Sequence, residues 1–329
     1  MKVCIYGAGA VGGLIGARLA AVKGAEVSAV ARGATLAAIN AGGLRVRTAD
    51  KEIRANVRAT DDPATLGEQD IVVLAVKGPS LGAVAERIGP LLGAHTAVMV
   101  AMNGVPWWFF DGFAGPYSGM RLESVDPGGR IARAIPAKHV VGCVVHLSAA
   151  TPEPGLIVPR AGNSLIVGEP DGTTTPRVSA LAELLTQGGL DVRVSSRIQH
   201  DIWYKLWGNM TMNPISAITG ATVDRILDDP LVIGFVSAAM REAGEIGARI
   251  GCALTETPEA RNEVARKLGA FRTSMLQDAD ARRPLEVDGI VTVVKEIGER
   301  IGVATPNIDI LLGLVRLFGR VHGIYPEAA

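Results

Sequence analysis

The chain has 329 residues, and its 33 lysines and arginines balance its 33 aspartates and glutamates. This balance leaves no net positive field for non-specific binding to nucleic acid or to an anionic membrane, and a composition of 48% hydrophobic and 20% charged residues excludes a disordered chain. No apolar run reaches the roughly 18 residues of a membrane span. We therefore expect a cytoplasmic, globular protein of two domains with no nucleic-acid partner, no membrane partner and no metal site.

The N-terminal stretch starts with a short apolar run, turns through glycines, and continues into an apolar helical pattern. Its turn reads Gly7, Ala8, Gly9, Ala10, Val11 and Gly12. A Gly-x-Gly-x-x-Gly turn between a strand and a helix is typical of dinucleotide binding, because the glycines allow a tight turn and a close pyrophosphate. The helix N-terminus then offers N–H groups to the phosphates. The alternative is a glycine-rich turn without a ligand.

The second predicted strand, 26–31, ends directly before Arg32. At this position an NAD-binding protein usually carries an acidic residue that holds the ribose 2′-hydroxyl. A guanidinium instead suits a 2′-phosphate, which a carboxylate would repel. The sequence therefore favours NADP(H) over NAD(H), and the alternative for Arg32 is a solvated surface arginine.

Two continuous apolar runs, 70–76 and 96–102, predict buried strands of a parallel sheet. Lys77 and Asn103 follow them directly, and a ligand crevice lies beyond the carboxyl ends of such strands. We expect Lys77 to contact phosphate or ribose and Asn103 to contact nicotinamide or substrate. The alternatives are a surface lysine at a helix start and a plain turn asparagine.

The remaining elements of the first half follow from their periodicity. We expect a helix up to about residue 23, a hairpin at 44–48 and 52–57, a helix near 81–92, strands at 140–147, 155–159 and 164–167, a helix at 176–187 and a strand at 191–194. Trp107-Trp108-Phe109-Phe110 is either a buried or interface cluster or an aromatic wall over the site. The segment 111–137 is rich in glycine and proline and predicts an irregular excursion or lid.

Strand patterns stop near residue 196. Helices are predicted at 198–213, 231–250, 258–280, 285–301 and 306–322. The predicted fold class is an α/β Rossmann-type N-terminal domain followed by an all-α C-terminal domain. We assign 1–195 to an NADP-binding domain and 196–329 to a helical domain for substrate binding and homodimerisation.

A polar stripe lies on the first of these helices. Lys205, Asn209 and Asn213 are four residues apart and share one face, while their neighbours are Trp, Leu and Met. Such a stripe is unfavourable to bury without partners. One lysine and two amides suit a small anion with hydroxyl or carbonyl oxygens, and lysine can also supply a proton. A snorkelling lysine beside surface amides is the alternative, and Pro214 should end or bend the helix after Asn213.

Ser274 and Glu286 lie in a second polar stretch, 273–288. Ser274 offers a hydroxyl. Glu286 follows Pro284, so it is either a functional carboxylate or one that the helix dipole favours at a helix start.

Taken together, these motifs resemble the ketopantoate reductase (2-dehydropantoate 2-reductase) family along nearly the whole chain. The resemblance rests on the glycine turn, Arg32, Lys77, Asn103-Gly104, Lys205-x3-Asn209-x3-Asn213-Pro214, Thr273-Ser274-Met275-Leu276-Gln277-Asp278 and Glu286-Val287-Asp288. It implies an NADPH-dependent oxidoreductase that reduces a 2-oxo acid, 2-dehydropantoate to pantoate, in pantothenate biosynthesis.

The resemblance also implies residue roles. Lys205 would be the general acid, and Glu286 would be a second catalytic-site residue that holds the substrate. Asn209, Asn213 and Ser274 would bind substrate, and Asn103 would lie beside nicotinamide and substrate. Two departures concern the substrate: Gly289 stands where the family usually has Asn-Gly, and the segment from Trp107 to 137 is longer than usual. A related hydroxy-acid dehydrogenase and a non-catalytic NADP-binding sensor are the alternative functions.

Overall fold

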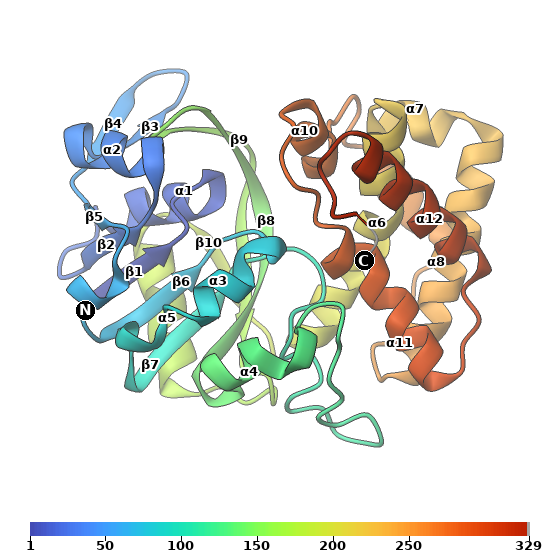
Figure 1. Cartoon of the computed structure of the whole chain (residues 1–329), viewed down its shortest axis with the longest axis horizontal. Coiled ribbons are helices and arrows are strands. Elements are labelled where there is room, and N and C mark those ends of the chain that lie inside the picture. Colours follow the sequence, from blue (N-terminus) through green and yellow to red (C-terminus); the bar gives the residue numbers. More distant parts are fainter. Residues whose placement is uncertain (328–329) are drawn as a thin grey trace. The chain divides into compact units, whose positions relative to one another are not determined.

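The computed structural model describes residues 1–327, which form two compact units (Figure 1). The first comprises Met1–Asn103, Trp107–Arg121 and Gly128–Asp201. The second comprises Gly104–Pro106, Leu122–Pro127 and the chain from Ile202 onward. The sequence predicts the domain boundary between residues 195 and 196. In the structure, the first unit extends six residues further, to Asp201.

The first unit is built on one mixed sheet of ten strands. The strands are β1 (Lys2–Tyr6), β2 (Glu26–Val30), β3 (Leu44–Arg47), β4 (Glu52–Ala55), β5 (Arg58–Thr60), β6 (Gln69–Leu74), β7 (Leu92–Val100), β8 (Val140–Glu153), β9 (Leu156–Gly168) and β10 (Asp191–Val194). Their spatial order is β4-β3-β9-β8-β7-β6-β1-β2-β5, with β10 paired to β9. Strands β5, β2, β1, β6, β7 and β8 pair in parallel, whereas β8 and β9 form a long antiparallel hairpin.

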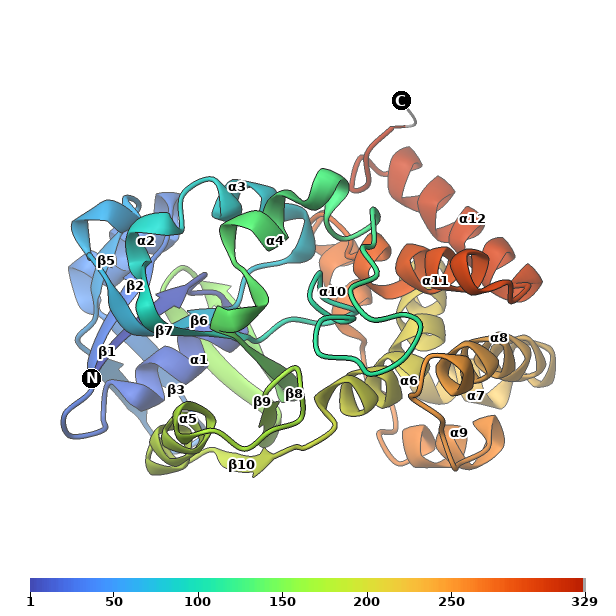
Figure 2. The same ribbon diagram turned by 90° about the horizontal axis from the view of Figure 1, so that it is seen from below.

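Helices cover both faces of this sheet. They are α1 (Ala10–Leu19), α2 (Gly33–Gly42), α3 (Leu81–Ala85), α4 (Arg130–Ala134) and α5 (Pro176–Gln187). Helices α1 and α5 pack together on one face and α3 and α4 on the other (Figure 2). Because the central strands are covered on both sides, they carry continuous buried apolar runs, as in the four fully or nearly fully buried residues 3–6 of β1. The Rossmann-type prediction for this half is confirmed.

Several boundaries in the first unit were predicted wrongly. The helix expected at 81–92 ends at Ala85, because Gly89 and Pro90 follow and proline cannot donate a helical hydrogen bond. The helix after the glycine turn ends at Leu19 rather than near 23. Strands expected at 155–159 and 164–167 are one strand, β9, with irregular register. The sequence prediction also missed α2 and β5.

The aromatic block 107–110 lies in the interior of the first unit. All four side chains are at most 2% exposed, and the Trp107 indole donates a hydrogen bond to the Ile135 carbonyl (3.3 Å). Phe109 and Phe110 meet edge to face, with ring centroids 5.1 Å apart. The buried-cluster interpretation is therefore confirmed. The neighbouring segment, expected to be irregular, includes the short helix α4.

The second unit is helical in its long stretch (Figure 1). Its helices are α6 (Ile198–Thr219, of which the second unit holds the part from Ile202), α7 (Val223–Asp228), α8 (Pro230–Arg249), α9 (Pro258–Arg266), α10 (Ser274–Asp280), a π-helical turn (Asp288–Thr292), α11 (Val293–Ile301) and α12 (Pro306–Val321). The predicted all-α class is confirmed. In the part of the chain from 1 to 327, no helix is long and apolar enough to cross a membrane.

Two helix predictions here were wrong. Helix α6 does not end at Asn213 but runs through Pro214 to Thr219, because Ile215 and Ala217 beyond the proline are buried and hold the last turns in place. The single helix predicted at 258–280 is two helices, α9 and α10. Gly269 adopts a positive φ between them, and the Thr273 hydroxyl caps α10 by accepting from the Leu276 N–H.

Helix α6 packs closely on α8. The indoles of Trp203 and Trp207 donate to the carbonyls of Ala243 (3.3 Å) and Met240 (2.7 Å). A Cβ at Gly247 would lie 2.3 Å from the Trp203 Nε1, so this glycine is required for the approach. The buried side of α6 is thereby held against α8.

Candidate functional site

The predicted cofactor residues of the first unit meet at one edge of its sheet. Strands β2, β1, β6 and β7 are parallel neighbours, so their carboxyl ends lie side by side. The Gly7 N–H donates to the Val30 carbonyl (3.1 Å), and the Ala75 N–H donates to the Tyr6 carbonyl (2.9 Å). Each predicted cofactor residue or turn begins at most three positions after the end of one of these strands: the glycine turn follows β1, Arg32 follows β2, Lys77 follows β6 and Asn103 follows β7. This is the edge at which α/β sheets bind ligands.

The glycine turn fits a dinucleotide. Gly7 has φ +100°, which other residues rarely adopt, and a Cβ on Gly12 would lie 2.1 Å from the Gly7 carbonyl oxygen. A Cβ on Gly9, in contrast, would meet no atom within 4 Å. Gly9 is the N-cap of α1 and supplies no side-chain cap. The turn therefore leaves open space beside a helix N-terminus, which suits a pyrophosphate.

Arg32 is exposed at the start of α2, directly after β2, which is the strand next to β1 in the sheet. Burial raises the pKa of the Tyr6 hydroxyl, and the positive charges of Arg87 and Arg32 partly oppose that rise. The effect shows that both cations lie near the end of β1. Lys77 is the residue that precedes the short helical turn Gly78–Ser80 after β6. Arg32 and Lys77 thus place two basic side chains at the edge that carries the glycine turn.

The second unit holds the polar stripe predicted on α6. Lys205 and Asn209 are half-buried and Asn213 is 5% exposed, while Leu206, Trp207 and Met210 on the other faces are fully buried. Beyond Asn209, the stripe leads into a small cavity of about 60 Å³. The cavity is lined by Gly208, Asn209, Met212, Asn213, Val223, Arg261, Asn262, Ala265, Leu268, Phe271 and Thr273. The structure therefore brings the two predicted asparagines to one hollow.

The break between α9 and α10 forms part of this cavity. Leu268, Phe271 and Thr273 line it from the connecting segment, which the sequence prediction had assigned to a continuous helix. Ser274 is the first residue of α10, directly after the cavity-lining Thr273, and is exposed.

Glu286 lies in a different segment, just before the helical stretch that starts at Val287. That stretch opens with a π-helical turn, a feature frequent at functional sites. Within the turn, the Gly289 carbonyl accepts from the Val105 N–H (2.8 Å), and a Cβ on Gly104 would lie 2.1 Å from the same oxygen. The position after Asn103 therefore requires a glycine, because the backbone of Gly289 lies directly against Gly104.

Arg261 is a cavity residue that the sequence analysis missed. Its guanidinium carbon lies 5.2 Å from the centroid of the Tyr204 ring, and its Nε atom is buried without a hydrogen-bond partner among the described residues. Burial, and a hydrogen bond to Glu256, raise the pKa of Tyr204, while Arg261 lowers it. In the sequence Arg261 resembles any surface arginine of a charged helix, so no local signal could have identified it.

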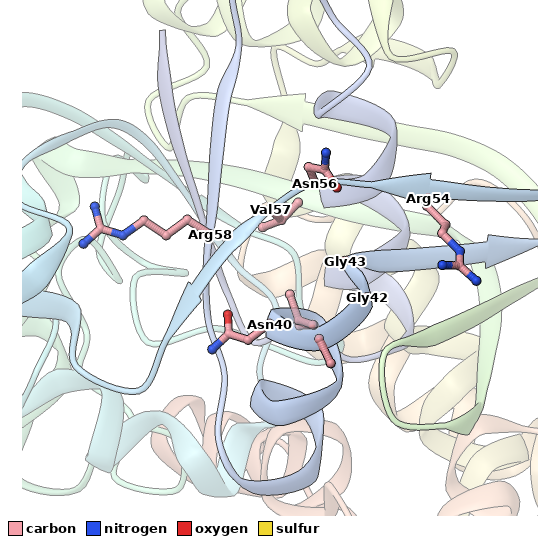
Figure 3. A pocket seen from close by; sticks show the side chains of 9 residues that line it. Asn40, Gly42, Gly43, Arg54, Asn56, Val57 and Arg58 are labelled. Carbon is pink, nitrogen blue, oxygen red and sulfur yellow. The ribbon is translucent and has the colours of Figure 1, made fainter.

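The first unit also has a hollow, which is larger than the cavity of the second unit. It measures about 520 Å³ and lies near the C-terminus of α2 (Figure 3). Its two arginines, Arg54 and Arg58, point away from each other (Figure 3). Arg58 already donates to the Thr65 carbonyl (3.0 Å), and Arg54 lies 3.8 Å from Glu52. The hollow contains none of the predicted site residues. Across the described residues, no group of three or more His, Cys, Asp or Glu side chains is placed to hold a metal ion.

Comparisons with known proteins agree with the motifs. Residues 3–107 match the family model described as "Ketopantoate reductase PanE/ApbA", and residues 197–318 match "Ketopantoate reductase PanE/ApbA C terminal". A 2-dehydropantoate 2-reductase of Mesorhizobium japonicum is 43% identical over 325 residues, covering 99% of this chain and 100% of the relative.

Two solved structures show the same fold. A crystal structure from Ralstonia solanacearum MolK2 is 57% identical with a TM-score of 0.95, covering 98% of this chain and 99% of that one. The structure of D-mandelate dehydrogenase with NADH and anilino(oxo)acetate is 22% identical with a TM-score of 0.83, covering 98% and 100%.

Proposed function

The chain belongs to the ketopantoate reductase family, an oxidoreductase family with a nicotinamide cofactor, and we propose that it catalyses the NADPH-dependent reduction of 2-dehydropantoate to pantoate. The observation that carries the proposal is the polar stripe on α6. Lys205 lies about one turn from Asn209 and two turns from Asn213 on one face of the helix, and the two amides line a cavity with no acidic side chain. A protein that only sensed the nucleotide would need neither a proton donor nor this hollow.

The cofactor is held, in this proposal, by the carboxyl edge of the first sheet. The space over Gly9 receives the pyrophosphate, and the free N–H groups at the start of α1 bind it. Arg32 pairs with the 2′-phosphate, and Lys77 contacts phosphate or ribose. Asn103 lies beside nicotinamide and substrate. When bound, the cofactor supplies a hydride to the substrate's carbonyl carbon.

The protein's own groups complete the reduction. The Lys205 ammonium polarises the carbonyl and donates a proton to the developing alkoxide, so that hydride and proton together convert the 2-oxo acid to a 2-hydroxy acid. Asn209, Asn213 and Ser274 orient the substrate oxygens, and Glu286 accepts a hydrogen bond from a substrate hydroxyl. These contacts stabilise the transition state most where the carbonyl oxygen gains charge.

A screen of NADPH oxidation with 2-oxo acids, including ketopantoate, tests the proposal together with Lys205→Ala. We expect kcat to fall by at least about 100-fold, the usual size of a lost general acid, while NADPH binding is unchanged. Lys295→Ala is the matched control, since Lys295 pairs with Glu299 on α11. Turnover of Lys205→Ala within threefold of wild type would show that Lys205 is not the acid. NADPH binding without turnover of any acid would favour a sensor.

We also propose that the protein is a homodimer that associates through α12. Ile310, Leu314, Leu317 and Val321 recur at helical spacing, and each is more than half exposed, from 51% to 73%. An exposed apolar stripe along one helix is typical of an interaction surface. A cytoplasmic location remains a prediction.

A further inference from the structure

The α6–α9 cavity of the second unit contains one cation that the proposed mechanism does not use. Arg261 lines it from α9, opposite Asn209 and Asn213 on α6. Gly208 favours this placement, because a Cβ there would lie 3.1 Å from the Arg261 Nη2 and the guanidinium would have to shift by a few tenths of an ångström. The guanidinium also lies over the Tyr204 ring, which fixes its plane.

The positive charge in this cavity has no negatively charged partner among the described residues. Arg261 forms no ion pair with any described carboxylate, its Nε is buried without a hydrogen-bond partner, and no acidic side chain lines the hollow. Arg261 is half-buried, and a buried Nε donor without a partner is unfavourable; an anion that accepts its N–H groups removes that penalty. Guanidinium binds carboxylate through two parallel hydrogen bonds. The rest of the lining is largely apolar, including Met212, Leu268 and Phe271.

We propose that Arg261 binds the carboxylate of the acid substrate in this cavity, where Asn209 and Asn213 donate further hydrogen bonds and the apolar wall accepts a compact side chain. The inference rests on the proposed function, which supplies the substrate class. The cavity volume, about 60 Å³, is several times the roughly 10–15 Å³ that one water needs. A carboxylate with a few carbon atoms fits this space.

The test compares a 2-oxo acid with its uncharged carboxamide. In Arg261→Gln, we expect the KM of the acid to rise by about 10- to 100-fold, the effect of losing a charge-assisted hydrogen-bonded pair, and that of the carboxamide to change less than threefold. NADPH affinity, measured by fluorescence, should be unchanged. Arg266→Gln on the same helix is the control, because Arg266 pairs with Asp228 on the surface.

Gly208→Ala provides a second variant that keeps the charge and improves helix propensity. Its methyl group crowds the guanidinium and shifts it by a few tenths of an ångström, so the acid should again lose more than the carboxamide. Equal losses for acid and carboxamide, or an acid KM within threefold of wild type in Arg261→Gln, would overturn the assignment.

Calorimetric binding of pantoate separates this inference from the proposed function. If wild type reduces no 2-oxo acid but binds pantoate, and Arg261→Gln does not bind it, the proposed reaction fails and the carboxylate site stands. If pantoate binds both proteins equally, the carboxylate site fails whatever the turnover.

Discussion

Gly9→Ala separates folding from cofactor binding at the glycine turn. In the free protein the added methyl group meets no atom within 4 Å, and the backbone at Gly9 (φ −79°, ψ −156°) is accessible to alanine. The loss of a glycine cap and the reduced entropy of the unfolded chain are each below about 1 kcal/mol and oppose each other. We therefore expect the melting temperature to change by less than about 2 °C.

Binding should respond differently, because the methyl group fills the space that we assign to the pyrophosphate. Overpacking a filled site costs about 1–3 kcal/mol, which raises the Kd of NADPH by about 5- to 150-fold. Fluorescence titration measures the Kd, and circular dichroism checks the melting temperature. Gly12→Ala is unsuitable for this purpose, since its Cβ would lie 2.1 Å from the Gly7 oxygen and disturb the fold itself.

Gly89→Ala is the matched control. A methyl group added at this glycine would likewise meet no atom within 4 Å, but Gly89 precedes β7 and so lies at the other end of the strand. Its NADPH affinity should equal that of wild type. If Gly9→Ala binds NADPH within threefold of wild type, the space over Gly9 does not hold the pyrophosphate and the reasoning is refuted.

Three further predictions concern cofactor choice, stability and assembly. Arg32→Glu should weaken NADPH by about 10- to 100-fold and leave NADH nearly unchanged, and an unaltered NADPH-to-NADH ratio would contradict the role of Arg32. Glu296→Gln should lower the free energy of unfolding by about 1–3 kcal/mol, because Glu296 accepts hydrogen bonds from the backbone N–H and hydroxyl of Ser124. Burial raises the pKa of Glu296, but these hydrogen bonds outweigh burial and hold that pKa below its usual value. The stability that ionised Glu296 contributes to the fold is therefore present above about pH 4.3, the pKa in the unfolded chain, and is lost as the pH falls through the lower folded pKa. Urea melts should show a smaller difference in unfolding free energy between wild type and Glu296→Gln at pH 3 than at pH 7. An equal difference at both pH values would contradict this role of Glu296. Leu317→Glu should shift the protein from dimer to monomer in light scattering, and an unchanged mass would exclude α12 as the interface.

Much of the cofactor edge was predictable because its signals are local. Gly7, Gly9 and Gly12 need particular backbone space within one turn. Lys77 and Asn103 follow apolar runs whose parallel pairing brings their ends together. The stripe on α6 follows from helical periodicity alone, and the structure leaves its Lys205 and Asn209 half-buried. Their chemical roles stay predictions.

The sequence alone determined the two fold classes, the glycine turn and the face shared by Lys205, Asn209 and Asn213, since each depends on residues within a few turns or strands of one another. Only the tertiary structure decided which distant groups meet. The break after α9 brings Phe271 to the α6 asparagines, α9 itself places Arg261 there, and Gly208 leaves room for the guanidinium. The aromatic block became core because Trp108 packs on Gly142 in β8. Such pairings depend on long-range packing, for which no periodicity in the chain provides a signal.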